Sequence, residues 1–361
     1  MSQAVLGTDT QINRPAAAAG AVSRPAKKKI KRRAGDRSQL TRRVVQYAFL
    51  ALNLWIGVEF YLFVRYYETG GQWPRVDRPA GVEGWLPIAS LMNLKAFLLT
   101  GEIPAMHPAG MFLLAAFLAT ALLLRKAFCS WLCPVGTLSE MLWKFGRSVF
   151  KKNWRLPRWG DITLRSLKHI LLGLFLFAVG SMSAAAIRLF LDGPYGIIAD
   201  VKMMNFFRYL GLTGAIVLGV IIMASIFVQN FWCRFLCPCG ALLGLLSRFS
   251  PVRIRRHASP CIDCGKCATA CPSLIPVDQL LTVRTPECTG CYDCVAACPV
   301  DDALEMQVAG RRLPAWGMAL AVGVIFLGFV GYAQWTGHWD TRLPDSVYFD
   351  LIPRAHEFSH P

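Results

Sequence analysis

Five long apolar blocks divide this 361-residue chain, and they constrain its fold more than any other feature. A helix needs ~20 residues to cross the ~30 Å hydrocarbon core of a bilayer, and the second block reaches that length only when Met106–Phe128 is counted. Charged residues make up only 17% of the chain, which excludes a disordered chain and an ordinary soluble enzyme. We therefore predict an all-α polytopic membrane protein with about five transmembrane helices. The blocks cover approximately Val44–Tyr66, Ala109–Leu124, Leu167–Leu189, Leu210–Val228 and Pro314–Gln334.

Basic residues are concentrated in alternate connecting segments. Of the 39 Lys and Arg residues, 30 lie in residues 1–43, 125–168 and 229–313. Because Lys and Arg accumulate on the cytoplasmic side, we expect these segments to face the cytoplasm of a bacterial inner membrane and the C-terminus to face the periplasm. The net charge of +17 then reflects this topology and contact with the lipid bilayer, and we expect no nucleic-acid partner.

Eight of the thirteen cysteines form a repeated pattern, C-x2-C-x2-C-x3-C-P, in residues 261–272 and 288–299. This spacing is typical of bacterial ferredoxins with two [4Fe–4S] clusters, in which the fourth cysteine of each motif binds the other cluster. A zinc site is one alternative, but it needs four ligands, whereas this pattern supplies two sets of four. Disulfides are the other alternative, but the cytoplasmic compartment expected for these residues is reducing. We predict one cluster on Cys261, Cys264, Cys267 and Cys298, and a second on Cys288, Cys291, Cys294 and Cys271.

A second repeat lies between the apolar blocks. Residues 127–138 and 231–242 share the pattern Cys-x3-Cys-Pro, 104 residues apart, which suggests a duplicated two-helix unit with both copies in the same orientation. Cysteines four residues apart share one helix face, so the two pairs can converge on a third metal centre. The alternative is that they are buried thiols at helix ends. These cysteines are Cys129, Cys133, Cys233 and Cys237; Cys239 has no counterpart in the first copy and is interpreted as packing.

Three ionisable residues in or near the apolar blocks are weak catalytic candidates. Oxidation of a quinol releases protons and needs a base near the membrane, which Glu59, His107 or His169 could supply. The alternative is that the histidines are interfacial and that Glu59 pairs with a neighbouring helix.

These features predict a helical membrane protein with an inserted cytoplasmic α+β ferredoxin domain. We expect a disordered basic tail, a membrane domain with four spans and both Cys-x3-Cys-Pro repeats, the ferredoxin domain, a fifth transmembrane helix and a periplasmic tail. Their boundaries are 1–43, 44–250, 251–312, 313–334 and 335–361.

With these motifs the chain resembles the membrane-bound polyferredoxin family of NapH-, NosR- and CcoG-like proteins, and most of all the NapH-type layout. The resemblance rests on both cysteine repeats and on the stretch from Gly81 through His107-Pro108, and it spans roughly residues 45–310. It implies electron transfer between the quinone pool and partner redox proteins, with quinone as the substrate. Whether the chain is only an electron-transfer component or the quinol dehydrogenase subunit of a respiratory complex stays open.

Two other functions are compatible with the sequence. An accessory factor for metallo-oxidase assembly would reduce a metal ion without reacting with quinols. A redox-sensing regulatory membrane protein would change its binding to a partner when a cluster is lost.

Overall fold

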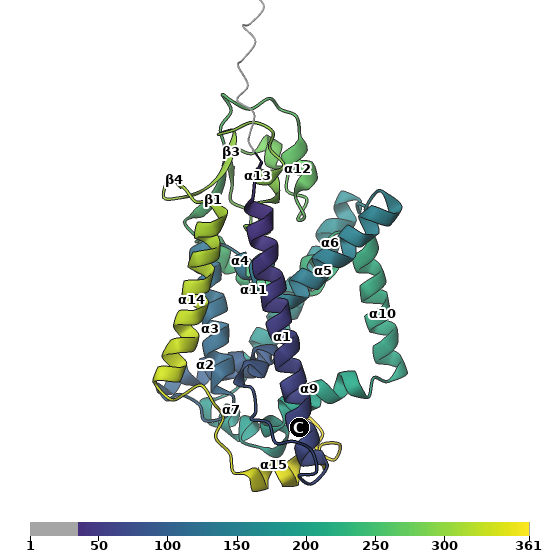
Figure 1. Ribbon diagram of the computed structural model, residues 1–361, viewed down its shortest axis with the longest axis vertical. Coiled ribbons are helices and arrows are strands. Elements are labelled where there is room, and N and C mark those ends of the chain that lie inside the picture. The colour runs from purple at the N-terminus through teal and green to yellow at the C-terminus, as the bar shows by residue number, and fades with distance from the viewer. Residues whose placement is uncertain (1–34, 361) are drawn as a thin grey trace, which may run out of the picture.

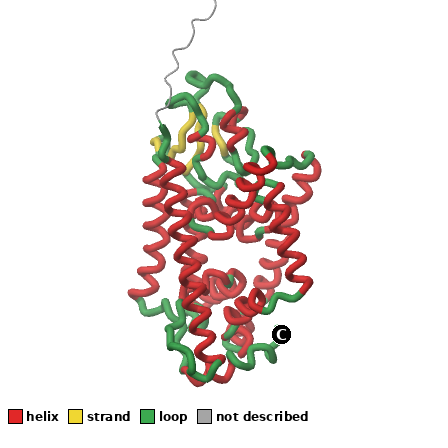
Figure 2. Tube along the Cα trace, turned by 45° about the vertical axis from the view of Figure 1, so that its right-hand side comes forward, coloured by secondary structure: helices red, strands yellow, loops and turns green. Residues whose placement is uncertain are grey.

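The computed structural model describes residues 35–360. Helices form the long body in Figure 1, and a small β-sheet with its loops lies at one end of that body, as the strands in Figure 2 also show. Residues 1–34 of the predicted disordered tail lie outside the described residues. Its last six residues instead belong to the first helix, α1 (Ser38–Glu68).

Three helices within residues 35–360 are long and apolar enough to cross a membrane: α1, α6 (Arg158–Ser181) and α14 (Ala315–Trp335). A fourth span results if α9 (Ala199–Arg208) and α10 (Leu212–Phe227), which are bent by 81° at their junction, are counted together. The chain is therefore a mostly helical membrane protein with three or four candidate spans. The first and last predicted blocks coincide with such helices.

The second apolar block forms the shorter helix α3 (Pro108–Leu124), whose 17 residues extend about 26 Å. The expected extension to Met106–Phe128 is wrong, because the flanking residues His107 and Arg125 have φ angles of 54° and 61° and end the helix. Most side chains of α3 are buried, and α14 and α2 (Pro87–Thr100) pack against it. It is the central helix of the body.

The third predicted block, Leu167–Leu189, is interrupted. The helix α6 ends at Ser181, and α7 (Ala184–Leu191) begins after Ser183, whose hydroxyl accepts a hydrogen bond from a backbone N–H of α7 at 3.1 Å. The ammonium group of Lys95 on α2 donates to two carbonyls at the end of α6, at 3.0 and 2.8 Å. These contacts satisfy the free backbone groups at the break.

The two Cys-x3-Cys-Pro repeats have the same order of elements. Each has an apolar helix, a short helical turn and a second helix. The apolar helix of each copy packs against the second helix of the other copy: α3 of the first copy contacts the second helix of the second copy, and α10 of the second copy contacts the second helix of the first. This reciprocal packing is what a duplicated two-helix unit predicts. The turn and the second helix are α4 (Ala127–Trp131) and α5 (Pro134–Phe150) in the first copy, and η2 (Trp232–Leu236) and α11 (Pro238–Ser247) in the second.

The sheet is antiparallel with strand order β2-β1-β3-β4. Ile254 on the central strand β1 pairs with Val283 on one side and with Met306 on the other. These side chains belong to one hydrophobic core with Trp131 of α4 and Met318 of α14, so the sheet is packed directly onto the helical body. The elements of this region are β1 (Val252–Arg256), α12 (Lys266–Ala270), η3 (Val277–Gln279), β2 (Thr282–Val283), α13 (Asp293–Ala296), β3 (Leu304–Val308) and β4 (Arg311–Arg312).

The opposite end of the body is closed by short helices and by the C-terminal residues (Figure 1). Tyr348 and Leu351 are buried against Phe60 and Phe63 of α1, so residues 335–360 fold onto this end. The short helices are η1 (Ala80–Trp85), α8 (Pro194–Ile197) and α15 (Asp345–Leu351).

Candidate metal centres

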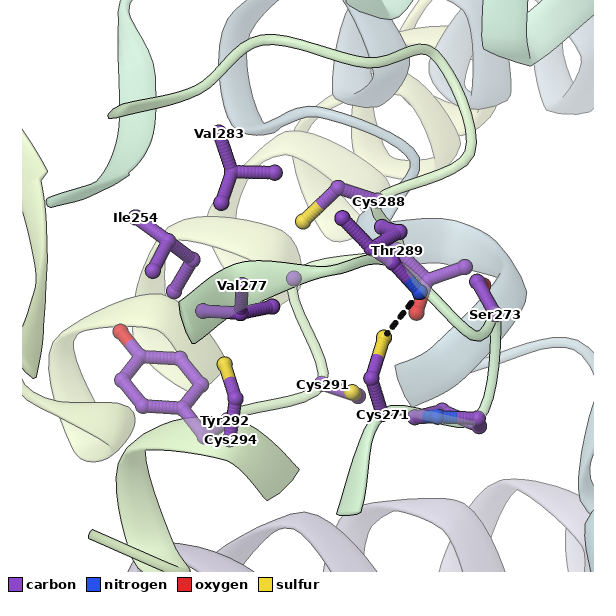
Figure 3. A pocket seen from close by; sticks show the side chains of 13 residues that line it. Ile254, Cys271, Ser273, Val277, Val283, Cys288, Thr289, Cys291, Tyr292 and Cys294 are labelled. Atoms are coloured by element: carbon purple, nitrogen blue, oxygen red, sulfur yellow. Dashed lines mark hydrogen bonds between the residues drawn. The ribbon is translucent and has the colours of Figure 1, made fainter. Parts of the chain in front are cut away.

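Four cysteines surround a cavity beneath the sheet, which we call the inner cavity. Figure 3 shows their side chains around it together with apolar neighbours such as Val283 and Tyr292. No Asp, Glu, Lys or Arg lines this cavity. A backbone N–H from Ile275 donates to the Cys271 sulfur at 3.4 Å. The four cysteines are Cys271, Cys288, Cys291 and Cys294.

A second cavity, the outer cavity, is surrounded by Cys261, Cys264, Cys267 and Cys298. It is open to solvent, since Cys264 is exposed, whereas three of the four cysteines of the inner cavity are buried. The structure therefore groups the eight cysteines into the same two sets that the spacing predicts, with Cys271 and Cys298 each crossing to the other motif.

Both motifs use the same local backbone. In each motif the residues before and after the second cysteine have positive φ angles: Asp263 at 49° and Gly265 at 69°, and Gly290 at 65° and Tyr292 at 62°. This left-handed conformation is uncommon for residues other than glycine. The repeated turn winds the first three cysteines of each motif around one cavity.

The arrangement fits an iron–sulfur cube better than a single metal ion. Within residues 35–360, no three His, Cys, Asp or Glu side chains are placed to hold one metal ion together. A zinc ion would need ligands that all lie about 2.0–2.3 Å from one point. A [4Fe–4S] cluster is instead held at its corners by four cysteines, which matches sulfur atoms spread around a cavity.

Cysteines of the Cys-x3-Cys-Pro repeats begin two helices. Cys133 precedes α5 and accepts a hydrogen bond from Gly136 N–H at 3.4 Å, and Cys237 precedes α11 and accepts one from Gly240 N–H at 3.2 Å. A Cβ atom on Gly136 would lie 2.2 Å from the carbonyl oxygen of Cys129, so only glycine fits there. The positive ends of both helices favour negatively charged sulfur at these positions.

The repeat cysteines gather into one group at the junction of the two copies. Burial raises the pKa of Cys133 to about 11, and it also raises the pKa of Cys233 and of Cys239, with the charges of Cys129, Cys133 and Cys237 adding to it. These thiols are therefore neutral when metal-free and would lose protons to a metal. Cys239, interpreted from the sequence as packing, lies within this group.

A third cavity, the junction cavity, lies between this group and the inner cavity. Cys129 and Cys233 line it from the helices, and Cys291 lines it from the loop that also surrounds the inner cavity. Charged side chains complete its wall: Arg42, Lys126, Glu140, Arg234 and Glu287.

Side chains of the helical body hold three consecutive carbonyls of the inner-cavity loop. Ser130 Oγ donates to Thr289 O at 2.6 Å, and Gln39 Nε2 donates to Cys291 O at 2.9 Å. Between them, the fully buried Trp131 donates through Nε1 to Gly290 O at 3.1 Å. The second repeat has Arg234 and Phe235 in place of Ser130 and Trp131, so only the first repeat carries these two donors.

Ion pairs fix the same loop. Lys168 of α6 pairs with Glu287 at 2.6 Å, and Lys126 lies 3.8 Å from the same carboxylate. Burial opposes the charge of Glu287, but the two ammonium groups outweigh it and lower its pKa to about 2. On the other side, Arg42 pairs with Glu140 at 2.7 Å and reaches Asp293 at 3.4 Å. The loop is thus held by charges from two helices, α1 and α6, and from Lys126, which directly precedes α4.

The three weak catalytic candidates do not come together. Glu59 is half-buried on α1 and makes no hydrogen bond or ion pair with the residues that the structure describes, and His169 is exposed on α6. His107 is buried, with Nε2 2.8 Å from Gly196 O and Nδ1 3.5 Å from Glu83. None of the three lines a cysteine cavity.

Two charged clusters were not predicted from the sequence. One is the set of charges around the junction cavity, and the other lies at the opposite end, where Arg78 pairs with Glu83 and with Asp200 at 2.7 Å each. Burial opposes ionisation of Glu83, but Arg78 and His107 lower its pKa to about 2. One sequence signal could have indicated these clusters, namely charged residues close to the apolar blocks. A charged side chain in or near a membrane is energetically costly unless it is paired with an opposite charge.

Comparison with known proteins agrees with this geometry. The family described as "4Fe-4S binding domain" matches residues 106–157 and 210–257, which are the two repeats, and the family described as "4Fe-4S dicluster domain" matches residues 255–306. The chain is 48% identical to YccM of Escherichia coli (strain K12), whose name ascribes electron transport to it, over 88% of this chain and 91% of that protein. The chain belongs to the membrane-bound polyferredoxin family.

Other relatives of this polyferredoxin are more distant. It is 27% identical to the ferredoxin-type protein NapH of Haemophilus influenzae over 49% of this chain and 61% of NapH. It is 30% identical to the methylamine utilization ferredoxin-type protein MauN of Paracoccus denitrificans over 41% of this chain and 48% of MauN. No solved structure matches the polyferredoxin chain. The predictions of iron–sulfur binding, electron transport and a membrane location are confirmed.

Proposed function

We propose that this polyferredoxin transfers electrons between the quinone pool and a redox partner protein. The observation that carries the proposal is the continuity of its cysteine sites. The junction cavity and the inner cavity share Cys291, while Cys271 and Cys298 connect the inner and outer motifs. A chain of sites therefore leads from the helical body to the exposed Cys264.

In this proposal the eight ferredoxin cysteines bind two clusters and the repeat cysteines bind a third. A [4Fe–4S] cluster accepts and releases one electron at a time. The residues of the chain supply position and environment: the inner cavity has apolar walls, and its loop is held by hydrogen bonds and ion pairs from the helices. The third set is Cys129, Cys133, Cys233 and Cys237.

The proposed orientation follows the distribution of basic residues. The ferredoxin domain faces the cytoplasm, and the end closed by α15 faces the periplasm, because 30 of the 39 Lys and Arg residues lie in the three segments assigned to the cytoplasm. The central helix α3 then acts as a fifth span despite its length. The outer cavity, with Cys264 exposed, faces a cytoplasmic redox partner.

Quinone would react within the helical body. Glu59 supports this proposal, because an ionisable residue on a spanning helix without a partner among the described residues is costly in a membrane and is a candidate proton acceptor. A Glu59→Gln variant that keeps its iron but reacts more slowly with a quinol analogue would assign it this role.

The test uses the full chain, purified without oxygen and studied by iron analysis and electron paramagnetic resonance. Two cubes would give roughly eight iron atoms per chain and three would give roughly twelve. A menaquinol or ubiquinol analogue should reduce the clusters, or the matching quinone should oxidise them. Iron-free protein would refute the cluster assignment, and iron-loaded protein that exchanges no electrons with either quinone would refute the quinone assignment.

The same sample separates the proposal from the other functions compatible with the sequence. Reduction of Cu²⁺ by the loaded protein, with no reaction toward quinols, would favour an accessory factor for metallo-oxidase assembly. A change in binding to a partner protein upon cluster loss, with no electron exchange, would favour a redox sensor.

A further inference from the structure

The segment between α5 and α6 has an unusual charge distribution. Residues 141–160 contain six Lys and Arg residues and no Asp or Glu. Two of the basic side chains have partners within the chain: Lys144 pairs with Glu140, and Arg147 Nε donates to Asn153 Oδ1 at 2.9 Å. These two are explained by the fold.

Three other basic residues of this segment, Lys151, Lys152 and Arg155, are exposed. They form no ion pair and no side-chain hydrogen bond with the residues that the structure describes. We call these three residues the basic loop. The three charges lie within five consecutive residues, and residues 141–160 contain no carboxylate side chain to compensate them, so they are available to an anion from outside the chain.

The basic loop is fixed to the end of an apolar helix. Trp154 N–H donates to the carbonyl of Phe227, the last residue of α10, at 2.9 Å, and the Trp154 ring stacks on Phe227 with centroids 5.0 Å apart. Asn153 Nδ2 also donates to Trp143 O at 3.0 Å, which ties the loop to α5. In Figure 1 the connection from α5 to α6 correspondingly lies near α10.

This position is the boundary between the apolar helices and water. The span α6 begins immediately after the basic loop, and α10 ends against it. Trp154 and Trp159 expose 60% and 75% of their surface, and Phe150 exposes 50%. Exposed tryptophans at such a boundary are typical of side chains that lie at the level of lipid headgroups.

We propose that the basic loop binds the headgroup of an anionic phospholipid. Lysine and arginine attract the phosphate, while the exposed aromatic rings enter the boundary between headgroups and acyl chains. The combination favours a lipid over a soluble anion, because a soluble anion would leave the exposed parts of these aromatic side chains in water. This inference is independent of the proposed redox function, since none of its residues lines a cysteine cavity.

The test compares lipid binding by full-length protein variants in a non-ionic detergent, measured by native mass spectrometry with phosphatidylglycerol and with phosphatidylcholine. A basic side chain near an anionic membrane strengthens association about fivefold. The variant K151Q/K152Q/R155Q should therefore bind phosphatidylglycerol at least about tenfold more weakly and should bind phosphatidylcholine unchanged. The variant K151R/K152R/R155K keeps the charges and should bind like the wild type.

A matched control removes the same charge elsewhere. Arg255, Arg284 and Arg311 are exposed in the sheet region and have no ion pair within residues 35–360. The variant R255Q/R284Q/R311Q should retain wild-type affinity. The proposal is overturned if the glutamine variant of the basic loop binds as the wild type does, or if the control weakens binding equally. Competition by soluble glycerol phosphate as strong as that by the lipid would also overturn it, in favour of a soluble anion.

Discussion

The two glycines that follow the Cys-Pro pairs give a sharp test of the repeat geometry. Gly136 and Gly240 occupy equivalent positions, three residues after Cys133 and Cys237, and neither has a positive φ angle. Alanine is a better helix former than glycine by about 0.8–1.0 kcal/mol, so helix propensity alone would favour alanine at both positions. The surroundings differ, however, because a Cβ atom would lie 2.2 Å from a backbone oxygen at Gly136 and 3.5 Å from one at Gly240.

We therefore expect opposite results for the two substitutions. Gly136→Ala must displace the carbonyl of Cys129, and overpacking of this kind typically costs about 1–3 kcal/mol. Gly240→Ala makes an ordinary contact and should be neutral or more stable by up to about 1 kcal/mol.

The assay has two readouts, the thermal unfolding midpoint in detergent and iron per chain. Gly136→Ala should lower the midpoint and should lose iron from the repeat cysteines, while Gly240→Ala should keep its iron and should leave the midpoint unchanged or raise it. Equal behaviour of the two variants would show that the two copies do not differ as the structure describes.

Three further predictions concern single side chains. Trp131→Phe leaves the buried Gly290 carbonyl without its donor and should cost about 1–3 kcal/mol, whereas Trp143→Phe removes a buried N–H that has no acceptor within residues 35–360 and should be neutral; equal loss of unfolding free energy in both would contradict this. Cys239→Ser should retain the iron of the repeat cysteines and Cys233→Ser should lose it, as iron analysis would show; loss in both would make Cys239 a ligand. Glu83 has a pKa lowered from 4.5 to about 2, so its ionised form stabilises the fold above about pH 4.5 by roughly 3 kcal/mol, and this is lost as pH falls toward 2. Glu83→Gln should therefore lower the unfolding midpoint strongly at pH 7 and much less at pH 3; an equal loss at both pH values would refute the ionic role.

Local patterns predicted much of the fold and the cysteine grouping. The spacing of eight cysteines predicted which four surround each cavity, because three of each set lie within one short turn whose backbone the spacing largely fixes. The repeated Cys-x3-Cys-Pro pattern likewise predicted two equivalent units. The first and last apolar blocks became long helices because nothing within them provides a stop.

Long-range contacts could not be predicted in the same way. Hydropathy alone did not reveal that His107 and Arg125 end α3, or that Lys95 binds the free carbonyls where α6 stops. The pairs Arg42–Asp293 and Lys168–Glu287 join residues far apart in the sequence, and only the folded chain places them together. Glu59, His107 and His169 were grouped by residue type, but the structure separates them.

The exchange of helices between the two repeats has a consequence for biosynthesis. Because α3 rests on α11 and α5 rests on α10, the first repeat emerges from the ribosome without the surfaces that bury it. The pocket that collects Cys129 and Cys233 is made from both copies, so it cannot exist until the second copy has been inserted. Under the proposed assignment of a third cluster to these cysteines, delivery of iron and sulfide to that pocket would follow translation of roughly two thirds of the polypeptide, and a chain terminated between the copies would bind no cluster there.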